Sequence, residues 1–354
     1  MKKITVNGDN FDLASVREVS GLLREGAIVA LPTETVYGLA AIYDNPDAVS
    51  RLYKIKRRPS GKPFTLCPGD SGKAKEKFGL LLPFGYRMID RFWPGPLTLI
   101  FHGANSQDKI GIRVPSHKFT RAVLEELGSF VCMPSANISG EKESLSAQDV
   151  DSLFGSSIDL VVDGGSPQFS QNSTVVDLTY HPFKILREGV IASQELMEVF
   201  FKKRVVFVCS GNTCRSPMAE HMLKKRLEEK FPHVAARYEV ISCGIIALEN
   251  QPANHEATKV LREEEGFDMA IHRSRKIDRN LVLSSDLFFV MEEVHRKYIL
   301  DLEPTAEARI FLLSKFLNPE SEEGIIDPIG RDRSVYKKVY SIIDQAVEEL
   351  ISWL

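Results

Sequence analysis

The chain has 354 residues, of which 43% are hydrophobic and 26% are charged, and its formal net charge is −3. Such a composition is typical of a globular protein with two domains of ordinary size, and the weak net charge excludes a polycation that attracts nucleic acid or anionic lipid through its overall field. Five scattered cysteines, a start without an apolar leader and the lack of any run of about 18 apolar residues predict a cytoplasmic chain with no membrane contact and no disulfide framework.

Apolar, strand-like runs alternate with amphipathic, helix-like stretches along the chain. The strand-like runs cover 27–31, 97–101, 130–133, 160–162, 205–208 and 287–291. The stretch 12–25 is typical of the predicted helices, and Ser193 is predicted to cap a short helix that ends at Phe200. We therefore predict an α/β protein with one domain over 1–202 and a second over 203–354.

Polar and basic side chains follow several strands in the first half of the chain. Hydroxyl-bearing residues come directly after the run at 27–31, and a basic cluster broken by proline and glycine lies at 54–62. Such a cluster suits a polyphosphate, because Lys and Arg form charge-assisted hydrogen bonds with phosphate oxygens. The candidate binding residues are Thr33, Lys56, Arg58, Lys62, Arg113, Ser135, Asn137, Ser173 and Arg187.

Two strings in this half resemble the threonylcarbamoyl-AMP synthase family. They are Pro-Thr-Glu-Thr-Val-Tyr-Gly-Leu at 32–39 and Phe-Trp-Pro-Gly-Pro-Leu-Thr at 92–98, and the resemblance extends over about residues 10–200. It implies a twisted α/β sheet with a basic concave face, which makes threonylcarbamoyl-AMP and pyrophosphate from L-threonine, bicarbonate and ATP. The product serves the formation of N6-threonylcarbamoyladenosine, so tRNA or the tRNA threonylcarbamoyl transferase is the partner that the resemblance implies.

The same resemblance assigns roles to the candidate residues. It implies that ATP, with Mg²⁺ on its phosphates, is held by Lys56, Arg58, Lys62, Ser135, Asn137 and Arg187. It implies that threonine is positioned by Thr33, Arg113 and Ser173, with Arg113 pairing the carboxylate. Cys67 stands where many members have a histidine near threonine, which is a departure from the family pattern. A second hypothesis makes this half an RNA-binding module without synthase activity, because a basic concave face also suits nucleic acid.

The segment 204–217 has a strand–loop–helix pattern that suits an oxyanion. An apolar strand leads to Cys209, Arg215 comes after five intervening residues, and Pro217 is predicted to open a helix. A loop between a strand end and a helix N-terminus turns its backbone N–H groups toward an anion, and these groups with a nearby cation stabilise a thiolate. A guanidinium can also hold two phosphate oxygens in bidentate fashion. We therefore predict phosphate chemistry through a cysteinyl-phosphate on residues 209–216, which we call the phosphate loop.

Asp327, in the string Ile-Ile-Asp-Pro-Ile-Gly, is the predicted acid and base of this chemistry. It would protonate the leaving group and later activate water, and the Asp-Pro pair predicts a rigid loop over the site. Asn212 is expected in a left-handed bend, and Ser216 is expected to hydrogen-bond the thiolate. Ordinary turn and cap roles are the alternative for these residues. The remaining predicted loop contacts are Ser210, Gly211, Thr213 and Cys214.

Further matches make this half similar to the low-molecular-weight protein phosphatase family over nearly its whole length. They are Ser-Cys-Gly at 242–244, Pro252 with Ala253, His-Arg-Ser-Arg at 272–275, and Asp286-Leu287 running to Met291 and His295. The resemblance implies a small doubly wound sheet, no cofactor, and phosphorylated proteins as substrates. Some members form a protective disulfide at the spacing of Cys209 and Cys214, and the alternative is that Cys214 is an ordinary buried residue. Cys243 replaces a small residue of the family.

Two positions bear on which phosphoryl group is removed. The tyrosine phosphatases of this family have a bulky aliphatic residue at the position of Thr213 and aromatic residues after Asp-Pro, whereas this chain has Ile329 and Gly330 there. The pattern is similar to that of the protein-arginine phosphatase branch, although that branch tends to keep an aromatic residue at the position of Ile329. We predict a phosphoarginine phosphatase, with a phosphotyrosine phosphatase as the alternative.

Overall fold

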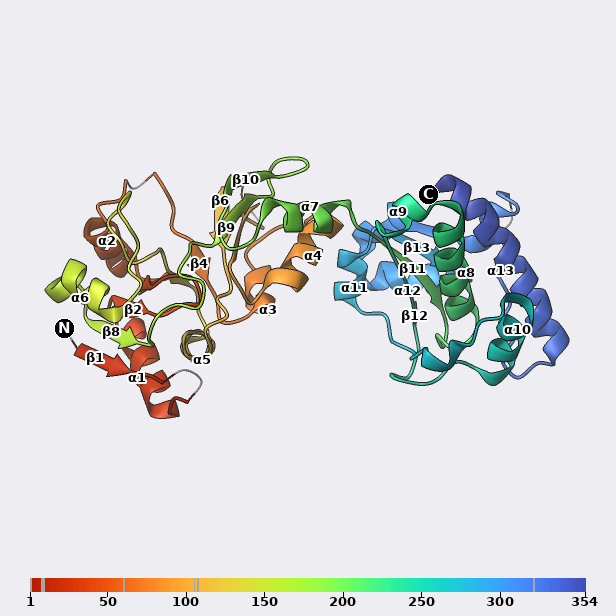
Figure 1. Cartoon of the computed structure of the whole chain (residues 1–354), viewed down its shortest axis with the longest axis horizontal. Helices are drawn as coiled ribbons and strands as arrows, with labels where there is room; N and C mark the ends of the chain where they lie inside the picture. Colours follow the sequence, from red (N-terminus) through yellow and green to blue (C-terminus); the bar gives the residue numbers. More distant parts are fainter. Residues whose placement is uncertain (1, 8–9, 60, 105, 107, 321) are drawn as a thin grey trace. The chain divides into compact units, whose positions relative to one another are not determined.

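A computed structural model describes residues 2–7, 10–59, 61–104, 106, 108–320 and 322–354. The chain divides into two compact units, which are drawn in Figure 1. Unit 1 comprises Met1–Leu81 and Met88–Met197, and unit 2 comprises Leu82–Arg87 and Glu198–Leu354.

Unit 1 is built on a ten-stranded mixed sheet in the order β1-β8-β2-β3-β7-β4-β6-β5-β9-β10. The strands are β1 (Lys2–Thr5), β2 (Val29–Leu31), β3 (Gly38–Ile42), β4 (Leu66–Cys67), β5 (Leu97–His102), β6 (Lys109–Ile112), β7 (Val131–Cys132), β8 (Leu160–Asp163), β9 (Thr174–Asp177) and β10 (Lys184–Arg187). The helices that begin in this half are α1 (Leu13–Arg24), α2 (Pro46–Ile55), α3 (Ser71–Lys75), α4 (Pro83–Phe92), α5 (Lys118–Leu127), α6 (Ala147–Phe154), the 3-10 turn Gly155–Ser157 and α7 (Ser193–Phe201).

Helix α1 illustrates how the sequence sets the element boundaries. Asp12 caps it by accepting from the N–H of Ser15 at 2.6 Å, and Gly26 ends it with φ +89°. The N–H of Ala27 then bonds back to the carbonyl of Leu22, so β2 begins two residues later than the predicted run at 27–31. The buried face of α1 packs with α5 against the β1–β8–β2 part of the sheet, where residues of all these elements form one apolar cluster.

Two helix starts differ from their predictions. Ser193 is the first residue of α7 rather than its cap, because the N–H of Leu196 bonds to the carbonyl of Ala192 and closes the first turn there. Pro217 is the third residue of its helix rather than the first, because the N–H of Met218 bonds to the carbonyl of Cys214 and closes a turn there. Proline is tolerated at this third position, since its missing N–H would have no partner inside the first turn.

Unit 2 carries a four-stranded parallel sheet in the order β12-β11-β13-β14, which confirms the predicted doubly wound fold. Its strands are β11 (Lys203–Cys209), β12 (Tyr238–Gly244), β13 (Leu287–Val290) and β14 (Ile310–Leu312). Its helices are α8 (Arg215–Lys230), α9 (Pro232–Ala235), α10 (His255–Glu265), α11 (Arg279–Ser284), α12 (Glu293–Leu302), α13 (Arg333–Trp353) and the 3-10 turns Met269–Ile271, Pro304–Arg309 and Leu313–Phe316.

Strand β11 alternates its side chains between two apolar clusters. Val205, Phe207 and Cys209 join the cluster formed with α8, α10 and α13. Val206 and Val208 join the cluster formed with α11 and α12 on the other face of the sheet. The whole strand is therefore held from both sides, and the phosphate loop leaves it from a fixed position.

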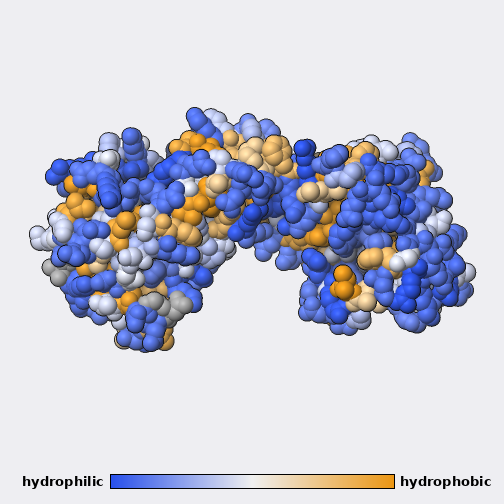
Figure 2. All heavy atoms as spheres, in the orientation of Figure 1, coloured by the Kyte–Doolittle hydropathy of each residue, from blue (hydrophilic) through white to orange (hydrophobic). Residues whose placement is uncertain are grey.

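Hydrophilic residues dominate the visible surface of each unit, and hydrophobic ones form only small patches there (Figure 2). Within the described part of the chain, no helix combines the length and the apolar character that a membrane span requires.

Candidate active sites

Two cavities in unit 1 collect the residues that were predicted to bind ATP and threonine. The larger, of about 440 Å³, is lined by all three predicted threonine-binding residues, Thr33, Arg113 and Ser173. The smaller, of about 380 Å³, is lined by all six predicted ATP-binding residues, Lys56, Arg58, Lys62, Ser135, Asn137 and Arg187. Four residues line both cavities, so the two adjoin; these are Arg58, Pro134, Ser135 and Arg187.

Arg113 enters the larger cavity with most of its guanidinium already engaged. Its Nη2 donates to the buried carboxylate of Glu34 at 2.7 Å, and its Nε donates to the carbonyl of Gly95 at 3.3 Å. The second oxygen of Glu34 accepts from the N–H of Ser116 at 3.0 Å. Only Nη1 of Arg113 therefore has no hydrogen bond within the described residues, and this group is left for a carboxylate ligand.

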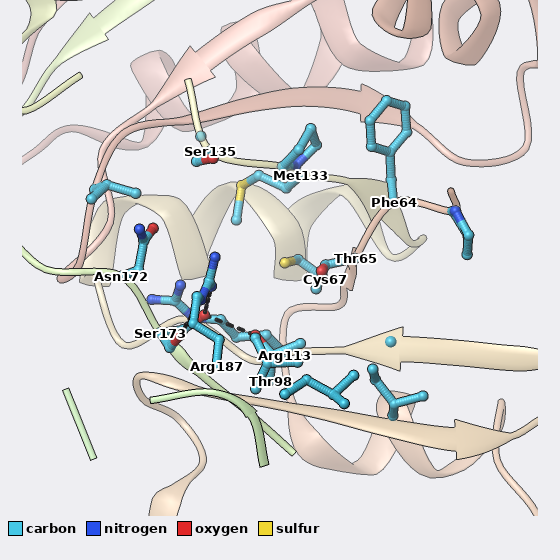
Figure 3. Close-up of a pocket in the computed structure, with 18 of the residues that line it drawn as sticks. Phe64, Thr65, Cys67, Thr98, Arg113, Met133, Ser135, Asn172, Ser173 and Arg187 are labelled. Atoms are coloured by element: carbon cyan, nitrogen blue, oxygen red, sulfur yellow. Dashed lines mark hydrogen bonds between the residues drawn. The ribbon is translucent and has the colours of Figure 1, made fainter. Parts of the chain in front are cut away.

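Ser173 links the floor of the larger cavity to Arg187 (Figure 3). Its hydroxyl lies 3.0 Å from that of Thr98 and accepts from Nη2 of Arg187 at 3.1 Å. Nε of Arg187 donates to the carbonyl of Ser173 at 3.0 Å, and burial lowers the pKa of the guanidinium. The side chains of Arg113 and Arg187 thus lie on the same side of the cavity, and both present positive charge to it.

Cys67 lies in the wall of the same cavity, together with Met133 (Figure 3). Burial raises the pKa of its thiol to about 12, so it faces the cavity as a neutral, weakly polar group. Thr33 also lines the cavity, but its hydroxyl donates to the carbonyl of Val36 at 2.6 Å. Its oxygen also accepts from the N–H groups of Thr35 and Val36, both at 3.2 Å, so this hydroxyl shapes the turn after β2 and has no hydrogen-bonding capacity left for a ligand.

Lys56 and Asn137 form the floor of the smaller cavity. Nζ of Lys56 is buried and donates to the carbonyl oxygens of Ser135 and Asn137, both at 2.5 Å, and to Oδ1 of Asn137 at 3.1 Å. Burial, with a smaller effect of the Arg58 charge, lowers the pKa of Lys56 to about 8. Lys56 thus holds the loop at 135–141 in place. The Ser135 hydroxyl donates its proton to Oδ1 of Asn137 at 2.7 Å, so the cationic side chains left to donate to phosphate are Arg58, Lys62 and Arg187.

In unit 2 the phosphate loop surrounds the thiol of Cys209, which lies at the carboxyl end of β11. Its Sγ accepts from the N–H of Asn212 at 3.2 Å and lies 2.9 Å from the Ser216 hydroxyl. The N–H of Asn212 and the N-terminus of α8 place partial positive charge against this sulfur. The structure therefore brings Cys209 and Ser216 together as the sequence predicted.

Asn212 holds the loop in shape from its centre. It adopts the expected left-handed conformation, with φ +55°. Its Nδ2 donates to the hydroxyls of Ser216 at 3.0 Å and Ser242 at 2.8 Å, and its Oδ1 accepts from the N–H of Arg275 at 2.9 Å. Its carbonyl oxygen accepts from Nε2 of His272 at 2.7 Å.

Arg215 is buried between two carboxylates. Its Nη1 pairs with Glu292 and its Nη2 pairs with Asp327, so the predicted acid lies directly against the predicted phosphate ligand. Its Nη2 also donates to the Ser210 hydroxyl at 3.1 Å. Its Nε is buried without a hydrogen-bond partner in the described residues. Such an orphan donor inside an anion cradle fits a phosphate oxygen.

The remaining loop cysteine is not activated. Burial raises the pKa of Cys214 to about 11, and its Sγ lies 3.7 Å from the Thr213 hydroxyl. Burial also holds the pKa of Cys243 well above its ordinary value. All five cysteines are free thiols in this structure.

Comparison with known proteins matches one family model to each half of the chain. Residues 21–189 match the Sua5/YciO/YrdC family model, described as "Telomere recombination". A threonylcarbamoyl-AMP synthase of Pyrococcus abyssi is 33% identical over 235 residues, which are 64% of this chain and 67% of that protein. The chain belongs to the threonylcarbamoyl-AMP synthase family. A synthase of Bacillus subtilis is also 33% identical, over 193 residues that are 52% of this chain and 56% of that protein, so the chain spans just over half of that relative.

The fold of this chain is similar to that of a solved structure of Pyrococcus abyssi Sua5 in complex with L-threonine. The TM-score is 0.54 and the identity 20%, over 99% of this chain and 98% of that one. Residues 204–354 match the model of the "Low molecular weight phosphotyrosine protein phosphatase" family. This synthase-family chain is thus an enzyme with a second, phosphatase domain.

Three contacts within these candidate sites were not predicted from the sequence. Glu34 lies inside the string at 32–39, but nothing in the sequence pairs it with Arg113. Glu292 had no signal at all, because its link to Arg215 joins positions 77 residues apart. His295 was noted only as part of a family match, although it bonds Ser210 in the loop.

Proposed function

We propose that residues 1–202 make threonylcarbamoyl-AMP for N6-threonylcarbamoyladenosine formation on tRNA. The amine of L-threonine bonds to the carbon of bicarbonate with loss of water, and an oxygen of the resulting carbamate bonds to the α-phosphorus of ATP as pyrophosphate leaves. The observation that carries this proposal is the pair of adjoining cavities with Arg58, Ser135 and Arg187 between them. An amino acid and a triphosphate bound in the two would meet at these residues.

The charges of the two cavities suit these substrates. Nη1 of Arg113 would pair the threonine carboxylate, and Arg58, Lys62 and Arg187 would neutralise the triphosphate, so that rate enhancement comes from positioning and charge. The described residues contain no group of three His, Cys, Asp or Glu side chains suited to a metal ion. Mg²⁺ therefore fits this cavity as an ion carried by the ATP phosphates, where it would neutralise the charge of the leaving pyrophosphate.

Pyrophosphate release by the full chain tests the synthase proposal. We expect release that requires both threonine and bicarbonate, and that is lost in Arg187→Ala but kept in Lys73→Ala, which removes a partly exposed cation of α3 outside both cavities. Release without threonine, or none at all, would favour the RNA-binding module instead.

We propose that residues 203–354 remove phosphoryl groups from proteins through a cysteinyl-phosphate. Sγ of Cys209 attacks phosphorus while the bond to the leaving group breaks, and the leaving atom takes its proton from Asp327. The Asp327 carboxylate then takes a proton from water, whose oxygen displaces sulfur and frees phosphate. Nε of Arg215, which lacks a hydrogen-bond partner among the described residues, would hold a phosphoryl oxygen, whereas Nη2 already contacts Ser210 and Asp327. The contact between Arg215 and Asp327 supports the assignment of Asp327, since it places the carboxyl group beside the phosphoryl site.

We infer that phosphoarginine is the preferred group. The exposed large hydrophobic residues in the described segments that border the loop are all aliphatic: Ile246, Leu248, Ile271, Ile326 and Ile329. Ile329, which follows Asp327-Pro328, is 60% exposed, so no aromatic wall stands there to sandwich a phenyl ring. A guanidinium needs hydrogen-bond acceptors instead, and Thr213 offers a hydroxyl oxygen.

Turnover of phosphoarginine and phosphotyrosine proteins by wild type and two variants tests this preference. Thr213→Ile adds bulk and removes the hydroxyl, whereas Thr213→Val removes the hydroxyl at nearly constant shape. We expect wild type to prefer phosphoarginine and both variants to lose that preference. A wild type that prefers phosphotyrosine, or variants with an unchanged ratio of kcat/KM values, would contradict the inference.

A further inference from the structure

His295 and Ser210 form a hydrogen-bonded pair beside the phosphate loop, and the steps above give neither a role. His295 lies in the first turn of α12 and has 0% of its surface exposed. Its Nε2 lies 3.0 Å from Oγ of Ser210, the residue that follows the nucleophile. The ring nitrogen that carries the proton decides whether His295 donates to Ser210 or accepts from it.

The hydrogen bonds fix where that proton lies. The backbone N–H of Glu292 donates to Nδ1 of His295 at 3.0 Å, so Nδ1 carries a lone pair. Burial, aided by the charge of Arg215, lowers the pKa of His295 to about 4, and the ring is neutral at neutral pH. A neutral imidazole whose Nδ1 accepts has its proton on Nε2. Nε2 therefore donates to the Ser210 oxygen.

The Ser210 oxygen receives a second hydrogen bond, from Nη2 of Arg215 at 3.1 Å. Both of its lone pairs are then occupied, and its hydroxyl proton has no acceptor within the part of the chain that the structure describes. The same Nη2 contacts Asp327, so the hydroxyl lies on the side of the loop where the leaving group departs. A hydroxyl in this state can act only as a donor.

We propose that the Ser210 hydroxyl donates a hydrogen bond to the transferred phosphoryl group and that His295 is the positioning residue that orients it. The proposal rests on the proposed phosphatase function. When a substrate is bound, a negatively charged phosphoryl oxygen can accept the hydrogen bond from this hydroxyl. A donor that is already oriented stabilises that charge without reorganising during the reaction. Loss of the Ser210 hydroxyl should therefore lower kcat more than it raises KM.

Variants of the full chain test this with an aryl phosphate, p-nitrophenyl phosphate, as the probe. Ser210→Ala is expected to lower kcat about tenfold with KM changed less than about twofold, and Ser210→Thr, which keeps the hydroxyl, is expected to restore most of it. His295→Leu is expected to lower kcat by a similar factor, and His295→Gln, whose amide can still donate, is expected to lose less. The double variant of Ser210→Ala with His295→Leu should be no slower than Ser210→Ala, because His295 acts through the hydroxyl.

Two results would overturn the proposal: wild-type kcat in Ser210→Ala, or a double variant that loses the product of the two single effects. If His295→Leu fails to fold, the comparison of Ser210→Ala with Ser210→Thr still decides. Threonine-dependent pyrophosphate release should be unchanged in all variants, since neither residue lines the cavities of unit 1. A wild type that turns over no phosphate ester or phosphoramidate would instead refute the phosphatase function itself.

Discussion

Replacing Asn212 tests whether one side chain holds the phosphate loop in its active shape. The side chain makes three hydrogen bonds, to Ser216, Ser242 and the backbone of Arg275, and has no exposed surface. Its backbone has φ +55°, a region that asparagine tolerates better than other non-glycine residues. Alanine at this position loses the bonds and keeps the strained backbone, whereas glycine loses the bonds alone.

The magnitudes follow from these contacts. At about 1 kcal/mol for each hydrogen bond, Asn212→Ala should lower the free energy of unfolding of unit 2 by about 3 kcal/mol. The left-handed backbone adds about 1 kcal/mol for alanine. Asn212→Gly should recover about 0.5–1 kcal/mol of this, because glycine relieves the strain but gains entropy in the unfolded chain.

Urea unfolding followed by tryptophan fluorescence measures this, since the chain has two tryptophans, Trp93 and Trp353. In a Trp93→Phe background Trp353 reports unit 2 by itself. We expect the order wild type, Asn212→Gly, Asn212→Ala in stability, and a fall in phosphatase kcat/KM of more than about tenfold in both variants. Equal stability of wild type and Asn212→Ala, or variants that keep wild-type kcat/KM, would refute the view that this side chain organises the loop.

Two other predictions concern buried charge. Glu34→Ala leaves Arg113 buried without its partner, so the free energy of unfolding of unit 1 should fall by about 3 kcal/mol, measured by Trp93 fluorescence in a Trp353→Phe background. An unchanged unfolding midpoint would show that Arg113 does not depend on Glu34. The pKa of His295 is lowered from 6.5 to about 4, so its neutral form contributes stability that is fully present above about pH 6.5 and is lost as the pH falls toward 4, about 3 kcal/mol in all. The charged groups that face the ring are Arg215, Glu292 and Asp327. Unit 2 should lose stability between pH 7 and pH 5 in wild type and less in His295→Gln, and parallel pH profiles would contradict this assignment.

The sequence predicted those parts of the sites that lie within short segments. The phosphate loop is one such segment: Cys209, Asn212 and Arg215 occupy fixed positions between a strand and a helix, so their spacing implies their geometry. The apolar clusters on the two faces of β11 were predictable for the same reason. The strand is a continuous apolar run, and its alternate side chains pack into one cluster or the other. Element ends were less predictable, because caps such as Glu188 at α7 depend on carboxylates outside the helix.

Contacts between distant segments were beyond sequence reasoning. Glu292 reaches Arg215 from the end of β13, and Glu34 reaches Arg113 from the turn after β2. Neither residue has a neighbour in sequence that implies its partner. Lys56 shows the same limit in another form: its basic character predicted a phosphate ligand, whereas its burial on backbone carbonyls makes it first a support for the loop at 135–141.

If one chain carries two active sites that work independently, a substitution in either site should abolish only the reaction of that site, and a crossed pair of variants measures this. Wild type, Cys209→Ser and Arg187→Ala are each assayed for threonine- and bicarbonate-dependent pyrophosphate release and for phosphate release from a phosphoarginine protein. We predict that Cys209→Ser loses only phosphate release and that Arg187→Ala loses only pyrophosphate release. A wild type that lacks either activity, or a variant that loses both, would show that the chain does not carry two independent active sites.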